Sequence, residues 1–176
     1  MKLNNIFRLL PIILSLIAFT GCAQQENNKN YNNKNSIEMK KENQSKEIVA
    51  TFFNAFGKGD YEGILSVFDD SVKIVAVRSQ EPDDFSPYGV FNGTDGLKLF
   101  LSNLGKLFDT KAFGVDNIIG EGQVAFANGS FTHQLKSTGK LFTSQWALMC
   151  TVEDGKITEF NFYEDSQKFS EANSQQ

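Results

Sequence analysis

The chain has 176 residues, 40% of them hydrophobic, and this length suits one folded domain with extensions. Its 17 phenylalanines are enough to fill an apolar core. The formal charge of −4 is small and mixed in sign, and the absence of a basic stripe excludes a nucleic-acid partner.

The N-terminus has the form of a targeting segment, with two basic residues before an apolar run at 9–19. That run is too short to remain as a membrane-spanning helix. The next residues, FTGC at 19–22, resemble a bacterial lipoprotein signal, in which cleavage leaves a lipidated cysteine as the new N-terminus. We therefore expect residues 1–21 to be removed and Cys22 to carry palmitate and other acyl chains as a membrane anchor. The alternative is an ordinary cleaved signal peptide followed by a chance cysteine.

Residues 22–44 are expected to form a flexible tether. They are dominated by Asn, Gln and Lys, and they hold too little apolar surface to repay the entropy of folding. Such a chain reaches roughly 25 Å. The alternative is a helical extension from Ile37. Ala23 follows the cysteine where enteric bacteria use Asp as a retention signal, so this resemblance favours the outer membrane of the cell envelope, facing the periplasm.

The second cysteine, Cys150, then has no partner for an intramolecular disulfide. It falls in a predicted strand, where we expect a small buried apolar residue. A catalytic thiol would need a neighbouring base and an electropositive setting.

Helical periodicity predicts two helices at the start of a domain that spans residues 45–169. One apolar face of the first helix is made by Ile48, Val49, Phe52, Phe53 and Phe56. Gly57 and Gly59 should end that helix, and Asp60 should cap a second, short one. We expect the second helix to end at residues 69–71.

A strand at 72–77 and a loop at 78–92 are expected next. The loop holds two prolines and the acids Glu81, Asp83 and Asp84, whose spacing lacks the ligand alternation of a calcium site. Thr94 or Asp95 should cap a third helix after a turn at residues 92–93. Its apolar stripe is formed by Leu97, Phe100, Leu101, Leu104, Leu107 and Phe108.

Strand patterns fill the rest of the domain, and residues 170–176 are expected to be a disordered tail. The predicted strands are 111–119, 123–136, 141–152 and 157–163, with a hairpin turn at 153–156. Neither face of strand 141–152 is consistently charged, so both should be covered. Helices would cover one face and a second subunit the other, which predicts a homodimer.

Helices early in the chain and strands late in it predict the α+β class. We expect a curved antiparallel sheet that forms a cone around about three N-terminal helices. The apolar interior of such a cone is a natural site for a ligand.

Several groups of residues resemble the SnoaL-like branch of the nuclear transport factor two-like superfamily, from about Glu47 to Phe169. In chain order they are Gly57–Glu62, Phe68–Val72, Tyr88–Gly93, Thr138–Lys140, Trp146-Ala147, Asp154–Ile157 and Tyr163–Asp165. The resemblance implies a cystatin-like fold. Ketosteroid isomerases, polyketide cyclases and limonene epoxide hydrolases share this fold, so it implies no single activity.

The catalytic set of the ketosteroid isomerases is not matched. Its tyrosine, its base and its protonated acid would fall near Phe52, Val75 and Leu148, which are all apolar. The carboxylate and arginine set of an epoxide hydrolase is also missing. Only Arg78 is found, and it could bind a substrate carboxylate or pair with an acid at 83–84. Whether the protein is an enzyme stays open at this stage.

Two residues are candidates for acid–base chemistry. His133 is the only histidine and alternates with Phe131 and Leu135 on one strand face, so it either borders the cavity or packs as a structural histidine. Asp165 ends the last strand, where the family commonly has an acid; the alternative is a cap or turn residue.

Four aromatic residues are candidates for the ligand pocket, with core or dimer packing as the alternative. They are Tyr88, Trp146, Phe52 and Phe162. One histidine and one free cysteine argue against a zinc or iron site, and no cofactor is expected.

Three functions remain open. The first is a membrane-tethered domain that binds a small hydrophobic ligand or serves as an accessory protein. The second is an isomerase, cyclase or hydrolase that uses His133 and Asp165 as acid and base. The third is a dimeric interaction module without a ligand. The polarity of the cavity would discriminate between them.

Overall fold

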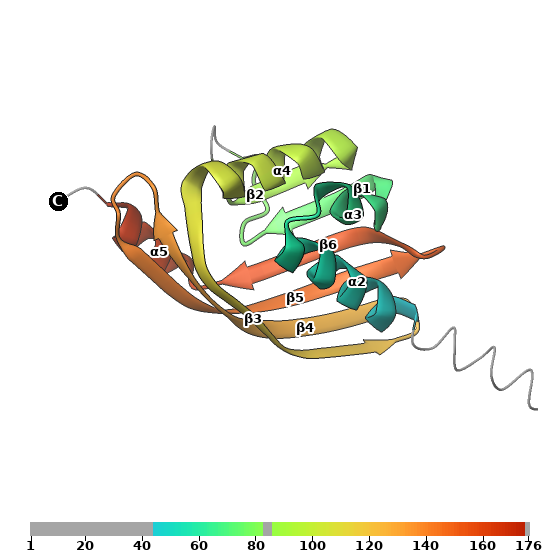
Figure 1. The fold of residues 1–176 in the computed structure, drawn as a ribbon. Coiled ribbons are helices and arrows are strands. Elements are labelled where there is room, and N and C mark those ends of the chain that lie inside the picture. The colour runs from blue at the N-terminus through green and yellow to red at the C-terminus, as the bar shows by residue number, and fades with distance from the viewer. Residues whose placement is uncertain (1–43, 83–85, 175–176) are drawn as a thin grey trace, which may run out of the picture. The chain divides into compact units, whose positions relative to one another are not determined.

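The computed structural model describes residues 44–82 and 86–174 (Figure 1). The expected signal peptide, Cys22, the tether up to residue 43, Asp83 and Asp84 lie outside the described residues. Within the described part of the chain, no helix is long and apolar enough to cross a membrane.

The core of the domain is a curved, mostly antiparallel sheet with helices on one face, as expected for the α+β class (Figure 1). Its six strands have the order β2-β1-β6-β5-β4-β3. Only β1 and β6 run parallel to each other. The helices α2 and α4 lie over the concave face, and the apolar residues of both pack into one core with the inner face of the sheet.

Helices α2 (Gln44–Lys58) and α3 (Tyr61–Ser66) form where the apolar periodicity predicts them. Val49, Phe52 and Ala55 are buried on one side of α2. The predicted cap of α3 is confirmed, because the Asp60 carboxylate accepts the Gly63 N–H at 2.9 Å.

Strand β1 (Phe68–Ala76) begins four residues before the predicted strand. The polar run at 69–71 does not end the helix but belongs to the strand. Phe68 and Val72 point into the core on either side of this run, and the pairing with β6 is irregular between Phe68 and Lys73. A short strand β2 (Gly89–Asn92) pairs with β1 at the end of the stretch 78–92, which was predicted to be a loop.

In helix α4 (Gly93–Leu107) the N-cap position is occupied by Asn92 rather than by Thr94 or Asp95, and the Asn92 side chain makes no capping hydrogen bond. Strand β3 (Phe108–Glu121) follows it directly and is longer than predicted. Irregular pairing with β4 at Lys111 and Asp116 bends β3 around the helices.

The strands β4 (Val124–Leu135), β5 (Leu141–Glu153) and β6 (Lys156–Glu164) follow the predicted alternation. On β5, the face that begins with Phe142 and ends with Val152 is buried. The other face is open in the described chain, and Leu141 on it is 62% exposed.

The last element, helix α5 (Ser166–Asn173), was not predicted. Residues 170–173 belong to it rather than to a disordered tail. Phe169 and Ala172, three positions apart, are its buried residues. Two apolar residues give too weak a periodic signal to be recognised in the sequence, and the helix is held by its contacts with β5 and the β4–β5 turn.

Candidate functional site

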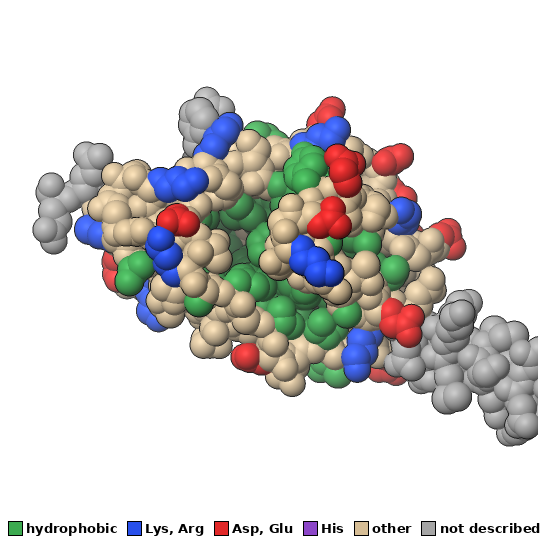
Figure 2. Space-filling view, viewed as in Figure 1, with side chains coloured by type: hydrophobic (Ala, Val, Ile, Leu, Met, Phe, Trp, Pro, Cys, Tyr) green, Lys and Arg blue, Asp and Glu red, His purple; other side chains and the backbone are tan. Residues whose placement is uncertain are grey.

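The concave side of the domain holds a cavity of about 60 Å³ whose wall is almost entirely aromatic or aliphatic. This space has room for about five water molecules, which corresponds to a ligand of one or two rings. Figure 2 shows the hollow and the hydrophobic side chains that line it. The lining residues include Phe52, Phe53 and Phe56 of α2, Phe100, Leu101 and Leu104 of α4, and Phe113, Phe131, Phe160 and Phe162 of the sheet.

A single carboxyl group lines this cavity, that of Glu164 at the end of β6. The Tyr88 hydroxyl, which also lines the cavity, donates a hydrogen bond to Glu164 Oε1 at 2.5 Å. Burial raises the pKa of Glu164 to about 7, even though the Tyr88 hydrogen bond acts in the opposite direction. Burial and the neighbouring carboxylate also raise the pKa of Tyr88 far above its ordinary value. Near neutral pH, Glu164 can therefore hold or accept a proton in an apolar enclosure.

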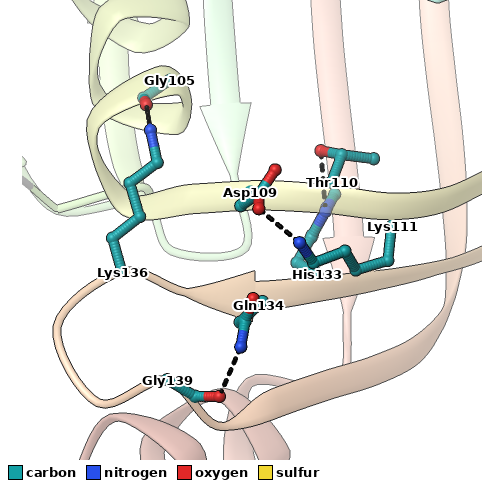
Figure 3. A network of polar contacts seen from close by, with 8 residues as sticks. All are labelled: Gly105, Asp109, Thr110, Lys111, His133, Gln134, Lys136 and Gly139. Atoms are coloured by element: carbon teal, nitrogen blue, oxygen red, sulfur yellow. Dashed lines mark hydrogen bonds and ion pairs between the residues drawn. The ribbon is translucent and has the colours of Figure 1, made fainter.

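His133 lies on the cavity wall as well, on β4. Its ring stacks between Phe131 and Phe108, with centroid distances of 4.2 and 4.8 Å. Its Nδ1 is 3.0 Å from the Thr110 hydroxyl (Figure 3). Burial lowers the pKa of His133 to about 4, so the imidazole is neutral at pH 7.

His133 and Glu164 belong to separate parts of the cavity wall. His133 pairs with Phe142 of β5, whereas Glu164 pairs with Trp146, four residues farther along the same strand. Two strand spacings and four residues of rise separate their Cα atoms by roughly 16 Å. The two side chains are thus two distinct polar points in one apolar cavity.

Asp165, the acid singled out in the sequence, does not line the cavity. It caps α5, where its carboxylate accepts the Lys168 N–H at 3.1 Å. That bond lowers the pKa of Asp165 below its ordinary value. The residue that sequence reasoning missed is Glu164, and the signal was available: Phe162 and Glu164 are two positions apart and so share a strand face.

Of the four aromatic candidates, Phe52, Tyr88 and Phe162 line the cavity. Trp146 lies behind the wall, stacked on Phe113 and Phe162 at 5.4 and 5.8 Å. Its buried Nε1 has no hydrogen-bond partner among the described residues. Trp146 therefore supports the lining side chains from behind.

No group of three histidine, cysteine or acidic residues that could hold a metal is present within the ranges 44–82 and 86–174. Cys150 is fully buried, and burial raises the pKa of its thiol far above the ordinary value. The titratable side chains that line the cavity are those of Glu164, Tyr88 and His133.

Residues 49–160 match the sequence profile of the SnoaL-like domain family. The chain belongs to this family. Tyr88 and His133 lie within the matched stretch of the SnoaL-like domain, whereas Glu164 and α5 follow it. A search of the curated proteins finds no match.

Solved structures share the fold of this SnoaL-like domain at low sequence identity. An NTF2-like protein from Burkholderia xenovorans LB400 is 22% identical, with a TM-score of 0.66 over 76% of this chain and 98% of that one. A proposed polyketide cyclase from Silicibacter sp. TM1040 is 15% identical, with a TM-score of 0.62 over 76% and 97%. TerC, crystallised with polyporic acid, is 23% identical, with a TM-score of 0.59 over 73% and 97%.

Proposed function

We propose that the SnoaL-like domain binds a small, flat hydrophobic molecule that carries one polar group. The observation that carries this proposal is an aromatic cavity whose only carboxyl group, Glu164, is hydrogen-bonded to Tyr88. The aromatic wall provides the contact area, and the Tyr88–Glu164 pair provides a hydrogen bond that fixes the orientation of the ligand.

The test is a titration with 2-naphthol, followed by the fluorescence of the single tryptophan, Trp146, which packs against the cavity wall. We expect saturable binding that Glu164→Gln and Tyr88→Phe weaken by about tenfold, the usual value of one buried hydrogen bond. The matched controls are Glu159→Gln and Tyr163→Phe, which change exposed residues of the same strand and should not affect affinity. Equal affinity in all four variants would contradict the proposal.

A second candidate function is proton transfer by Glu164, favoured by its enclosed position and its pKa of about 7. In this proposal the base is Glu164 and the hydrogen-bond donor is Tyr88, in place of the acid–base pair His133 and Asp165 that the sequence predicted. The probe is 2-tetralone, an enolisable ketone whose α-hydrogens exchange with deuterium in D₂O. Exchange should increase as the pH rises through 7 and fall by about 10² in Glu164→Gln. Exchange that is unchanged in Glu164→Gln would leave binding as the function.

We also propose that two copies pair through the open face of the sheet. Glu153, at the end of β5, is the one charged side chain among the outward residues of β4 and β5. The others are Val124, Phe126, Asn128, Ser130, Thr132, Gln134, Leu141, Thr143, Gln145, Ala147, Met149 and Thr151. Phe126 is 51% exposed and pairs with Ile119, which is 67% exposed. A two-fold contact over this face therefore brings mostly uncharged groups together.

In sedimentation experiments at micromolar concentration, Phe126→Lys should shift a dimer to monomer, because it places a charge on the exposed apolar pair of Phe126 and Ile119. Leu99→Lys is the control, since Leu99 is similarly exposed at 47% but lies on α4. A wild-type protein that sediments as a monomer would contradict the dimer.

The proposed site of action is the bacterial cell envelope, with the domain held at the membrane by lipid on Cys22. The sequence FTGC at 19–22 and the polar segment that follows it support this anchor. Cys22→Ser should release the protein from the membrane fraction of its native host, and a variant that stays membrane-bound would contradict the lipid anchor.

A further inference from the structure

The backbone is strained beside the candidate site, at Val77. Its φ is 63°, in the left-handed region that branched side chains rarely adopt. Among the described residues, Asp154 with a φ of 49° is the only other non-glycine with positive φ. Asp154 lies in the β5–β6 turn, and aspartate tolerates this conformation. The positive φ of Asp154 is thus explained by its turn, whereas the positive φ of Val77 needs a separate explanation.

The strained turn is held firmly to the sheet next to Glu164. The Val77 N–H donates to the Phe162 carbonyl at 2.8 Å, and Phe162 is two residues before Glu164. The Arg78 N–H closes the turn by donating to the Ala76 carbonyl at 2.6 Å. The turn thus fixes where the chain leaves β1 with respect to the end of β6.

The turn also directs the next side chain onto the tyrosine of the site. The guanidinium carbon of Arg78 is 5.5 Å from the centroid of the Tyr88 ring, a cation–π contact. Phe169 of α5 packs against the same ring at 5.0 Å. The Tyr88 ring thus lies in contact with both Arg78 and Phe169, and its hydroxyl donates the hydrogen bond to Glu164.

We propose that the strained turn at Val77 is a positioning device, which places Arg78 on Tyr88 and so holds the Tyr88 hydroxyl against Glu164. A glycine at this position would remove the strain and keep the turn, since glycine stands at six other positive-φ positions of the described residues. The inference rests on the proposed role of Glu164, but it concerns the geometry of the ligand-free protein. Val77 and Arg78 act through Tyr88 and are not themselves catalytic.

The test follows the titration of the Glu164 carboxyl by carbon NMR in the ligand-free protein. The charged or titratable groups around it are Tyr88, Asp165, Arg78 through the Tyr88 ring, and His133 elsewhere on the cavity wall. The Tyr88 hydrogen bond lowers the pKa of Glu164, so loosening this bond must raise the titration midpoint above about 7. Tyr88→Phe removes this hydrogen bond completely, so it should give the largest rise in the Glu164 midpoint, about one pH unit.

Val77→Pro should raise the midpoint by about half a unit, because the proline ring fixes φ at about −65° and forbids this turn, whereas Val77→Gly, which adopts a positive φ without strain, should leave it unchanged. Arg78→Ala should also raise it, and Arg78→Ala added to Val77→Pro should raise it little further, because both changes release the same contact. Arg78→Ala alone tests the same point if the proline variant does not fold.

An unchanged midpoint in Arg78→Ala, or full additivity of Arg78→Ala with Val77→Pro, would overturn the inference. Failure of the proposed function is distinguishable from both, because it appears as loss of 2-naphthol discrimination between wild type and Glu164→Gln, whatever the titration midpoint.

Discussion

We expect the stability of the wild-type protein to change little between pH 4.5 and 6.5, and the variants Glu164→Gln and His133→Gln to show steep pH dependences of opposite sign. The cause is a pair of buried groups whose pKa values move past each other. The pKa of Glu164 is raised from 4.5 to about 7, and that of His133 is lowered from 6.5 to about 4. Each shift corresponds to about 3 kcal/mol of unfolding free energy.

The signs follow from the protons that each state binds. Between pH 4.5 and 7 the folded state keeps the Glu164 proton that the unfolded state has released, so the Glu164 contribution falls as the pH rises. Between pH 4 and 6.5 the unfolded state holds a His133 proton that the folded state lacks, so stability falls as the pH drops. In the wild type the two slopes cancel where the windows overlap.

Removing one group exposes the slope of the other. Glu164→Gln should lose about 3 kcal/mol as the pH falls from 6.5 to 4, and His133→Gln should lose about 3 kcal/mol as it rises from 4.5 to 7. Urea unfolding at each pH, followed by Trp146 fluorescence, measures both. The lowered pKa values of Asp69, Asp109 and Asp165 affect stability mainly below this range. A pH-independent His133→Gln variant would contradict the buried state of Glu164.

Most of the fold is readable from the sequence because its elements carry strong periodic signals. The Phe-rich face of α2 and the alternation of β5 each match one side of the final core. The elements β2 and α5 could not be predicted. The strand β2 has only four residues and α5 has only two buried apolar positions, so both depend on tertiary contacts rather than on a periodic pattern. Tyr88, the residue before β2, lines the cavity, and Phe169 of α5 packs against its ring at 5.0 Å.

The candidate site is only partly readable for the same reason. The face of His133 follows from its spacing to Phe131, and the structure places both on the cavity wall. Asp165 and Glu164 are adjacent acids at the end of a strand, and a choice between them requires the phase of β6. That phase is set by Phe160 and Phe162, which point to the cavity, so the carboxyl on their face is Glu164. The strain at Val77 has no signal in the sequence, because valine is an ordinary strand residue.

Gly129→Ala should lower the free energy of unfolding by about 3 kcal/mol, at the upper end of the usual cost of overfilling a packed site. Gly129 lies on β4 opposite Val115 and Trp146 of the adjacent strands. A Cβ placed on it would be 2.0 Å from the Gly114 carbonyl oxygen and 2.6 Å from Cζ2 of Trp146. The carbonyl is part of the backbone of β3 and can move only if the two strands separate.

Gly114→Ala is the matched control, because a Cβ there would have its nearest neighbour at 3.9 Å, and we expect its stability to stay within about 0.5 kcal/mol of wild type. The damage in Gly129→Ala should reach the cavity, since the displaced indole is stacked on Phe113 and Phe162 of the cavity wall. Urea unfolding and 2-naphthol affinity at 10 °C, where the variant stays folded, measure the two effects. A variant that loses stability but binds 2-naphthol as tightly as wild type would show that Trp146 does not shape the wall.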